Sequence, residues 1–271
     1  MTSQAMQDRP GRHRILLALD ISPRSRLALA AAVELAVKLD AELAGLFVED
    51  LNLLRLSALP FAREISPFSS VARPIALAQV QRALRREAAE VEQQLAQAAE
   101  RMRLRWTFQI QRGQIAAELF ALAGECDLVV LGKRSRSGVR GLGREMAGLP
   151  RGLDHDPVLA VFDGSAGAHR ALELAAHLAH AGGTHLRLLI PAESDEIYQQ
   201  YANEARAVLA REAVVAAVIG RIPALAIATL AAAARAEHCG ALVLRDDGQL
   251  RSAEGYSALL DEVDCPVLLV R

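Results

Sequence analysis

The fold is decided by residues 15–49, ILLALDISPRSRLALAAAVELAVKLDAELAGLFVE, because a second version of this stretch follows 143 positions later. The second version is residues 158–192, VLAVFDGSAGAHRALELAAHLAHAGGTHLRLLIPA, and it aligns with the first without a gap. Identical pairs include Leu16/Leu159, Asp20/Asp163, Ser22/Ser165, Ala28/Ala171, Leu35/Leu178 and Leu46/Leu189. Self-similarity of this kind indicates a repeated structural unit.

A shorter block repeats at a different offset. CDLVVL, which begins at Cys126, returns as CGALVL at Cys239, 113 positions later. Because the two offsets, 143 and 113, differ by 30, the first copy carries about 30 extra residues between its blocks. We therefore expect two copies of one domain, at residues 13–150 and 157–271, with an insertion and a long helix at 51–104 of the first.

Each copy reads as alternating strands and helices. The run Ile15–Leu19 has the continuous apolar character of a buried strand, and Ser22 followed by Pro23 is typical of a helix start. Further strands are expected at 43–48, 107–111, 128–131, 158–162, 186–190, 214–219, 242–244 and 267–270, with a helix at 115–126. Strands that alternate with helices predict open parallel sheets, so the fold class is α/β with two tandem parallel-sheet domains.

One strand is missing from this pattern. The second copy ends in a fifth strand, Val267–Val270, but the equivalent segment of the first copy, Val158–Val161, already serves as the first strand of the second copy. We therefore predict about nine strands, with the first copy lacking its own fifth strand. An open edge invites pairing, so either Val267–Val270 or a second chain should cover it. We accordingly expect self-association as a homodimer or other homo-oligomer.

Composition narrows the class of protein. The chain has 52% hydrophobic residues and a net charge of −1, which argues against a strongly basic nucleic-acid binder. The three cysteines lack metal or disulfide spacing, so we expect a reducing, cytoplasmic setting. The polar N-terminus has no signal-peptide core. The apolar stretch 213–234 could be mistaken for a membrane span, but the repeat divides it into a strand, a turn and a helix.

The order and duplication of these elements resemble a tandem universal stress protein. The residues that carry the resemblance are ILLALDISPRSRLALAAAVELA (15–36), AGLFVED (44–50), DLVVLGKRSRSG (127–138), VLAVFDGSAGAHRALELAAHLA (158–179) and DCPVLLVR (264–271). The resemblance implies a five-stranded parallel sheet related to adenine-nucleotide-binding folds. It also implies that some members bind ATP at the carboxyl ends of strands one and four, as open α/β sheets generally bind ligands.

The family's nucleotide loop reads Gly-x-x-Gly, nine residues, then Gly-Ser or Gly-Thr. Here Gly132 matches the first glycine, but Ser135 and Glu145 stand at the next two glycine positions, with Gly143 as a substitute. The nucleotide contacts that the resemblance implies in the first copy are Asp20, Ser22, Val48 through its backbone, Leu131, Gly132, Arg134, Ser135, Gly143 and Arg144. In the second copy, LRDDG at 244–248 has lost both glycines, so we expect no nucleotide there and a structural role for Asp163.

A basic loop follows Gly132. Residues 132–144 hold Lys133, Arg134, Arg136, Arg140 and Arg144 and no acid, in a chain with 29 arginines and two lysines. These cations could hold phosphate by charge-assisted hydrogen bonds. The alternative is a solvated loop in an arginine-rich protein. Residues 246–247, two aspartates, are read as a polar turn.

The insertion in the first copy has two readings. Residues 51–74 form a connection too apolar for disorder, so it would cover the crevice or pack against another subunit. A helix is expected at about 75–102, either contacting a partner or lying across both domains.

The sequence contains no nucleophile elbow, Walker loop or metalloprotease motif, and His177 and His180 lack a third metal ligand. We therefore expect a non-catalytic stress-response sensor or interaction module that binds ATP or another adenine nucleotide, with Mg²⁺, in the first copy only. A ligand-free scaffold is the alternative, and an adenine nucleotide hydrolase a third.

Overall fold

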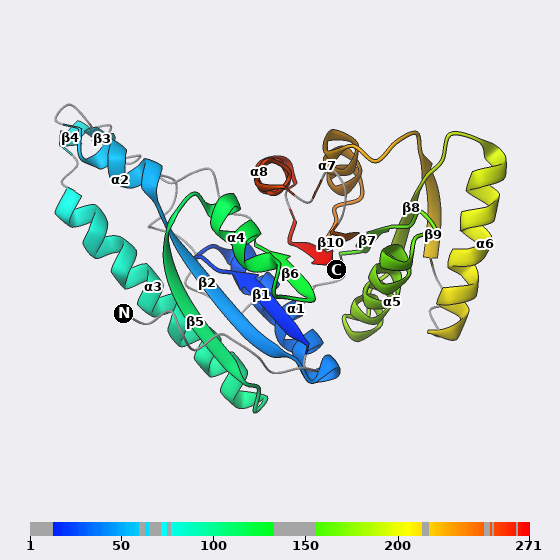
Figure 1. Ribbon diagram of the computed structural model, residues 1–271, viewed down its shortest axis with the longest axis horizontal. Coiled ribbons are helices and arrows are strands. Elements are labelled where there is room, and N and C mark those ends of the chain that lie inside the picture. The colour runs from blue at the N-terminus through cyan, green and yellow to red at the C-terminus, as the bar shows by residue number, and fades with distance from the viewer. Residues whose placement is uncertain are drawn as a thin grey trace.

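The computed structural model describes residues 13–59, 63–65, 72–74, 77–132, 156–212, 217–246, 250, 252–263 and 265–271. These residues form one large sheet between two layers of helices (Figure 1). The strands of the large sheet are β1 (Arg14–Ala18), β2 (Glu42–Asp50), β5 (Trp106–Gly113), β6 (Leu128–Leu131), β7 (Val158–Val161), β8 (Leu186–Pro191), β9 (Ala217–Ile222), β10 (Ala241–Arg245) and β11 (Val267–Val270). The helices are α1 (Pro23–Leu39), α2 (Leu51–Ser57), α3 (Leu77–Arg101), α4 (Ile115–Ala123), α5 (Ala166–Ala181), α6 (Asp195–Arg211), α7 (Ile227–Ala236) and α8 (Ala253–Glu262).

The strand order shows two halves that meet at a shared strand. Among the described residues the sheet has nine strands, in the order β5-β2-β1-β6-β11-β10-β7-β8-β9. The first half contributes β5-β2-β1-β6, and the second repeats that arrangement as β9-β8-β7-β10. β11 pairs in parallel with β10 and antiparallel with β6, so the two predicted sheets are continuous.

This arrangement confirms the prediction of nine strands and of β11 as the strand that covers the first half. Leu268 of β11 stands opposite Val130 of β6 and opposite Val243 of β10, and all four residues of β11 are buried. The backbone groups of β11 are thus used on both sides, as buried backbone must be. Because the edge of β6 is covered within the chain, it gives no reason to expect a second chain, and that argument for self-association was wrong.

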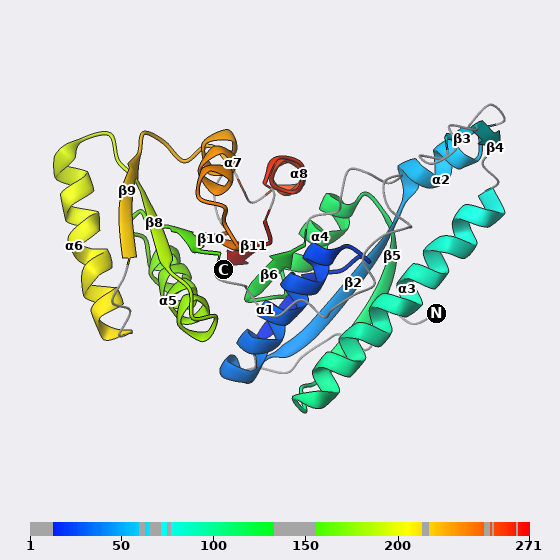
Figure 2. The ribbon, with the colours of Figure 1, turned by 180° about the vertical axis from the view of Figure 1, so that it is seen from behind.

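Side chains of successive residues in β1 enter two different cores, as strand geometry requires. Ile15 and Leu17 belong to a core shared with α1, α3, α5 and α6, whereas Leu16 and Ala18 belong to a core shared with α4, α7 and α8. Each core runs through both halves of the chain. Seen from behind in Figure 2, α1 and α3 lie in front of the strands of the first half. The two halves are therefore joined in two ways, by the pairing of β6 with β11 and by helix packing on both faces of the sheet.

The insertion in the first half contains a helix and two short strands that the sequence did not predict. Residues 51–57 form α2, and residues 63–65 and 72–74 form a short antiparallel pair, β3 (Arg63–Ile65) and β4 (Ala72–Pro74). α2 packs on β2 and α3, and in Figure 1 it extends beyond the end of the sheet. α3 packs on β2 and β5 beside α1, so the expectation of a helix lying across both domains was wrong.

Two further expectations concern the second half. β9 covers residues 217–222 rather than the predicted 214–219. The apolar stretch 213–234 resolves, within its described residues, into β9 and the start of α7, as the repeat predicted. Among the described helices, the structure contains none long and apolar enough to cross a membrane.

Candidate functional site

Asp20 and Ser22 shape the turn between β1 and α1. The carboxylate oxygen Oδ1 of Asp20 accepts a hydrogen bond from the backbone N–H of Ser22 at 2.8 Å. The Ser22 hydroxyl accepts from the backbone N–H of Ser25 at 3.1 Å, and the buried Ser25 hydroxyl accepts from the N–H of Asp20 at 2.9 Å. These bonds satisfy backbone donors at the turn and the helix start. Asp20 therefore has a structural role, whatever else it binds.

Gly132 follows β6 and lies against the first turn of α1. A Cβ atom built on Gly132 would stand 3.0 Å from the Cα of Ser25 and 3.5 Å from the carbonyl oxygen of Ala18. A side chain at this position would therefore force β6 and α1 apart. The absence of a side chain at Gly132 therefore allows α1 to pack closely against the end of β6, next to the Asp20 turn.

The second half repeats the Asp20 turn but closes its crevice. Oδ1 of Asp163 accepts from the backbone N–H of Ser165 at 3.1 Å, and the Ser165 hydroxyl accepts from the N–H of Ala168 at 3.2 Å. The residue that aligns with Gly132 at the offset of 113 is Arg245. Its guanidinium Nη2 lies 2.8 Å from Oδ2 of Asp163. The second half therefore neutralises its strand-end aspartate with a side chain of its own.

The space around this ion pair is small. Asp163 and Arg245 line a pocket with room for little more than a water molecule, together with Val161, Leu225, Leu244 and Leu250. The Cβ of Arg245 passes 3.4 Å from the position that a Cβ on Gly167 would take, so α5 approaches the arginine closely. The prediction of a structural role for Asp163 was made from the lost glycines alone. The alignment of Gly132 with Arg245 was the signal that could have revealed the ion pair.

The remaining residues that the family resemblance implies as nucleotide contacts fall into two groups. Val48 and Leu131 lie buried near the carboxyl ends of β2 and β6, on the same edge of the sheet as Asp20 and Gly132. Arg134, Ser135, Gly143 and Arg144, with the rest of the basic loop, lie outside the described residues.

Two ion pairs were not expected from the sequence, one near this edge and one where the two halves meet. Glu49, after Val48, is 8% exposed, and its Oε2 lies 2.9 Å from Nε and 2.7 Å from Nη2 of Arg112 on β5. Asp246, read as part of a polar turn, instead has a fully buried side chain 2.8 Å from Nε of Arg271. Both pairs join residues far apart in sequence, and no local pattern marks them.

Arg271 connects the two halves. Its guanidinium also donates to the carbonyl oxygen of Ala123, at the end of α4, and its backbone N–H donates to the carbonyl of Asp127 at 3.0 Å. Figure 1 accordingly shows the C-terminal end of the chain at the centre of the molecule. The residue that follows β11 is thus held by the second half through Asp246 and by the first half through α4.

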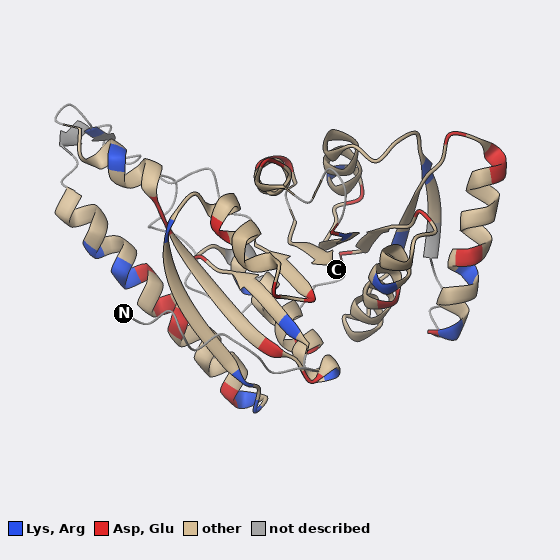
Figure 3. Cartoon of the chain, in the orientation of Figure 1, with Lys and Arg blue, Asp and Glu red and all other residues tan. Residues whose placement is uncertain are grey.

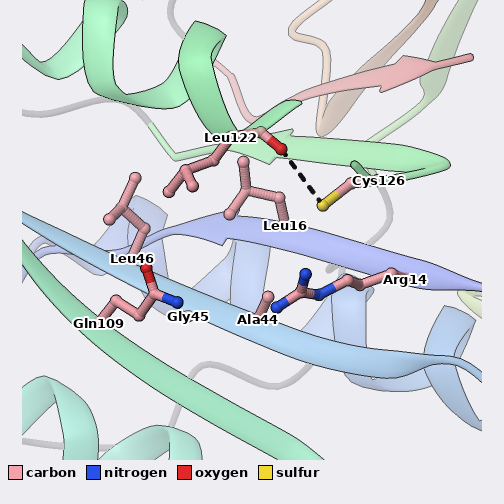
Figure 4. Close-up of a pocket in the computed structure, with 8 residues that line it drawn as sticks. All are labelled: Arg14, Leu16, Ala44, Gly45, Leu46, Gln109, Leu122 and Cys126. Atoms are coloured by element: carbon pink, nitrogen blue, oxygen red, sulfur yellow. Dashed lines mark hydrogen bonds between the residues drawn. The ribbon is translucent and has the colours of Figure 1, made fainter. Parts of the chain in front are cut away.

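A second small pocket lies at the opposite, amino-terminal edge of the first half (Figure 4). It also has room for little more than a water molecule. In Figure 4 the Arg14 guanidinium points toward Ala44 and Gln109, and the Cys126 thiol points to the carbonyl of Leu122. Burial raises the pKa of the Cys126 thiol to about 11. This pocket is too small for a nucleotide.

Metal chemistry has no support in the described part of the chain. Its His, Cys, Asp and Glu side chains form no group of three that could hold a metal ion. Nδ1 of His177 lies 3.0 Å from Oε2 of Glu212 on the neighbouring helix, and Cys126, Cys239 and Cys265 are free thiols.

The fold is that of an open α/β protein in which the strand-end aspartate of the second half, Asp163, is paired with Arg245, and the aligned position in the first half is Gly132. A family model, the universal stress protein family, matches residues 11–144. The first half of the chain therefore carries a universal stress protein domain, and the family resemblance read from the sequence is confirmed for that half.

One solved structure supports the fold over nearly the whole chain, and two more are reported beside it. The crystal structure of a universal stress protein from Archaeoglobus fulgidus DSM 4304 matches 95% of this chain and 96% of its own, at 15% identity and a TM-score of 0.53. A putative universal stress protein from Pseudomonas aeruginosa UCBPP-PA14 matches 96% of this chain and 93% of its own, at 15% identity and a TM-score of 0.49. A universal stress protein in complex with cAMP matches 44% of this chain and 98% of its own, at 20% identity and a TM-score of 0.38. A comparison with curated proteins finds no match.

Proposed function

We propose that this protein is a non-catalytic stress-response module that binds one adenine nucleotide, in the crevice between the ends of β1 and β6. The observation that carries the proposal is the contrast between Gly132 and Arg245. Where the second half places a guanidinium on its strand-end aspartate, the first half has a glycine that a Cβ could not replace without displacing α1. Family membership supports a nucleotide as the ligand.

Each of these residues of the first half would have a separate role in binding the nucleotide. The backbone at Val48 would face the adenine, and the backbone amide of Gly132, next to the Asp20 turn, would donate to the phosphates. Asp20 holds the N–H of Ser22 in place and supplies the single carboxylate at the turn. Bound Mg²⁺ would shield that carboxylate from the phosphates. No side chain in this set is placed to act as a nucleophile or a general base.

The test is isothermal titration of the intact protein with ATP and ADP in the presence of Mg²⁺. We expect binding at one site per chain, and loss of binding in Gly132→Arg, which installs the residue of the second half. Because this change also crowds Ser25, Asp20→Asn provides an independent variant. The asparagine can still accept from Ser22 N–H, so it removes the charge and keeps the turn. A change in affinity of at least about tenfold is expected for loss of one charged contact to a bound ligand.

The matched control is Arg245→Ala, which alters the equivalent position of the closed crevice and should leave affinity and stoichiometry unchanged. Absence of binding by the intact protein would overturn the nucleotide proposal. Two sites per chain, or binding that persists in both Gly132→Arg and Asp20→Asn, would show that the site lies elsewhere.

A ligand-free scaffold is the second candidate, and one observation favours it. Leu53, Leu56 and Leu59, on and after α2, expose between 37% and 57% of their surface. This is the apolar surface that the scaffold interpretation predicted for residues 51–74. If titration shows no heat while the protein still associates through this region, the scaffold interpretation replaces the nucleotide proposal.

A further inference from the structure

Two of the three cysteines lie side by side at the start of neighbouring strands. Cys239 stands two positions before β10, and Cys265 stands two positions before β11. The two strands pair in parallel with Leu242 opposite Val267, and this register, extended back by two residues, sets Gly240 opposite Cys265. The thiols of Cys239 and Cys265 hydrogen-bond to each other. The fold therefore joins two thiols that are 26 positions apart in the sequence.

The backbone at these two cysteines suits a disulfide. Neighbouring strands lie about 4.8 Å apart, and a strand rises about 3.3 Å per residue. Cys239 is one position out of register with Cys265, so their Cα atoms stand about 6 Å apart. Disulfides most often join Cα atoms about 5.5–6 Å apart. A bond therefore needs a small approach of two sulfur atoms already in contact, and neither strand has to shift.

Both cysteines are held in place by the helices that precede them. The backbone N–H of Cys239 donates to the carbonyl oxygen of Ala234 in α7 at 2.9 Å, as at a Schellman-type helix end. α8 leads into Cys265, and Nη1 of Arg235 donates to the carbonyl oxygen of Glu262 at 3.1 Å. This last bond ties the end of α7 to the end of α8. The two thiols are thus kept near each other by the surrounding backbone.

The two thiols differ in access, and both are slow to react. Cys265 is 6% exposed, whereas Cys239 is partly exposed, so an oxidant meets Cys239 first. The hydrogen bond with Cys265, together with burial, raises the pKa of Cys239, which therefore stays a thiol at neutral pH. Because the thiolate is the reactive form, we expect slow oxidation that needs sustained exposure to an oxidant.

The charges around the pair favour an uncharged oxidant. Residues 235–239 and 261–265 together hold four acids and one arginine, and Figure 3 shows acidic residues in α8. Oε2 of Glu237 is paired with Nε of Arg187 at 3.1 Å, and the other acids keep the surroundings negative. Such a field repels an anionic oxidant such as glutathione disulfide, whereas hydrogen peroxide is small and carries no charge.

We propose that Cys239 and Cys265 form a redox site that hydrogen peroxide converts into a disulfide. The sulfur of Cys239 attacks one peroxide oxygen, the O–O bond breaks, and the products are a sulfenic acid on Cys239 and one water. The sulfur of Cys265 then attacks the sulfur of Cys239, the S–O bond breaks, and the hydroxyl leaves with the Cys265 proton as a second water. The two thiols lose two electrons, which reduce one peroxide to two waters. A thiol reductant reverses the change.

The disulfide fastens the strand that joins the two halves. β11 lies between β10 and β6, and α8 packs on α7 and on α4 of the first half. A bond between the turns before β10 and β11 closes a loop of 25 residues, 240–264, that contains α8. Closing such a loop restricts the unfolded chain more than the native one. Oxidation should therefore raise Tm by about 5–10 °C.

Cys126 is a matched control within the chain. It aligns with Cys239 at the offset of 113 and likewise stands two positions before its strand, β6. However, β11 runs antiparallel to β6, with Val270 opposite Leu128. Cys265 therefore lies at the far end of this strand pair from Cys126. Cys126 has the same place in the repeat but is out of reach of the thiol that would complete a disulfide.

The test is peptide mapping of the full chain by mass spectrometry, after hydrogen peroxide and then N-ethylmaleimide to block the remaining thiols. Trypsin should release residues 236–245 joined to residues 252–271, and dithiothreitol should separate them. The linked peptides and the rise in Tm should persist in Cys126→Ala and disappear in both Cys239→Ser and Cys265→Ser, with circular dichroism to show that each variant is folded. Glutathione disulfide at the same concentration should act more slowly than peroxide.

Four outcomes would overturn the proposal. The disulfide could include Cys126, or it could join two chains. Cys239 could oxidise to a sulfinic acid while Cys265 takes up N-ethylmaleimide. Both thiols could stay unmodified at a peroxide concentration that oxidises the chain in urea. An unchanged Tm after complete oxidation would remove the effect on the joint between the halves. None of these measurements involves ATP, so the result is independent of the nucleotide proposal.

Discussion

Arg245 places Nη2 of its guanidinium 2.8 Å from Oδ2 of Asp163, across the end of β7 from the end of β10. In the first half the equivalent aspartate is Asp20, and the residue that aligns with Arg245 is Gly132. The position after the fourth strand thus carries a side chain that reaches the strand-end aspartate in the second half and carries no side chain in the first.

The Asp163–Arg245 pair should contribute to stability. Because the two side chains are only 19% and 28% exposed, Arg245→Ala leaves a largely buried carboxylate without its cation. We expect a loss of about 1–2 kcal/mol in the free energy of unfolding, measured by urea denaturation. The double variant Asp163→Asn/Arg245→Ala removes the charge as well and should recover part of the loss. Equal loss in the single and double variants would contradict this account.

Arg271 should matter more, because its partner is more deeply buried. The Asp246 side chain is fully buried and the Arg271 side chain is 14% exposed. Arg271→Ala strands a buried charge and removes the contact with α4, so we expect a loss of about 2–4 kcal/mol. Asp246→Asn combined with Arg271→Ala should restore much of it. An unchanged urea midpoint for Arg271→Ala would show that this residue does not hold the halves together.

Gly45 and Gly220 offer a matched pair of strand glycines. A Cβ on Gly45 of β2 would stand 2.4 Å from Cδ2 of Leu95 and 3.0 Å from Cδ2 of Phe108, whereas one on Gly220 of β9 would meet Leu189 at 3.6 Å. Gly45→Ala should push α3 away from the sheet and cost about 1–3 kcal/mol. Gly220→Ala should change stability by less than about 1 kcal/mol. Thermal denaturation of the two variants, side by side, checks the difference.

Cys126 should make stability depend on pH in the alkaline range. Burial raises the pKa of its thiol from 9.0 to about 11. Between these two values the unfolded chain releases the thiol proton and the native chain keeps it. The free energy of unfolding should therefore fall as pH rises from about 9 to about 11. Cys126→Ala should reduce this slope, and Cys239, whose pKa is also raised by Cys265 and by burial, accounts for what remains.

Alkylation gives a second readout for the same thiol. At pH 8 Cys126 should react with iodoacetamide far more slowly in the native protein than in urea, as followed by mass spectrometry, because the thiolate is the reactive form. Equal rates in the two states would contradict the buried, protonated thiol.

Sequence reasoning located most of the elements because their signals are local. Leu128–Leu131 and Val267–Val270 were predicted at their observed bounds, and the predicted cap at Ser22 follows from a side chain that bonds backbone three residues away. β9 was misplaced by three residues because its surroundings, residues 213–234, are apolar throughout. The α2 helix was missed because a run of seven residues gives too little periodicity. The division at residues 150 and 157, and the phosphate contacts of the basic loop, stay predictions.

The sequence by itself determined that one unit is written twice and that the first unit lacks a fifth strand of its own, since repeats and strand patterns are properties of neighbouring residues. Only the tertiary structure decided what that strand does. β11 runs antiparallel to β6 because the second half is turned relative to the first, and this turn merges two sheets into one. The tertiary structure likewise decided that Arg271 contacts α4 and that Arg112 forms an ion pair with Glu49. Such pairs depend on which strands become neighbours in space, and chain order does not specify this until the sheet is assembled.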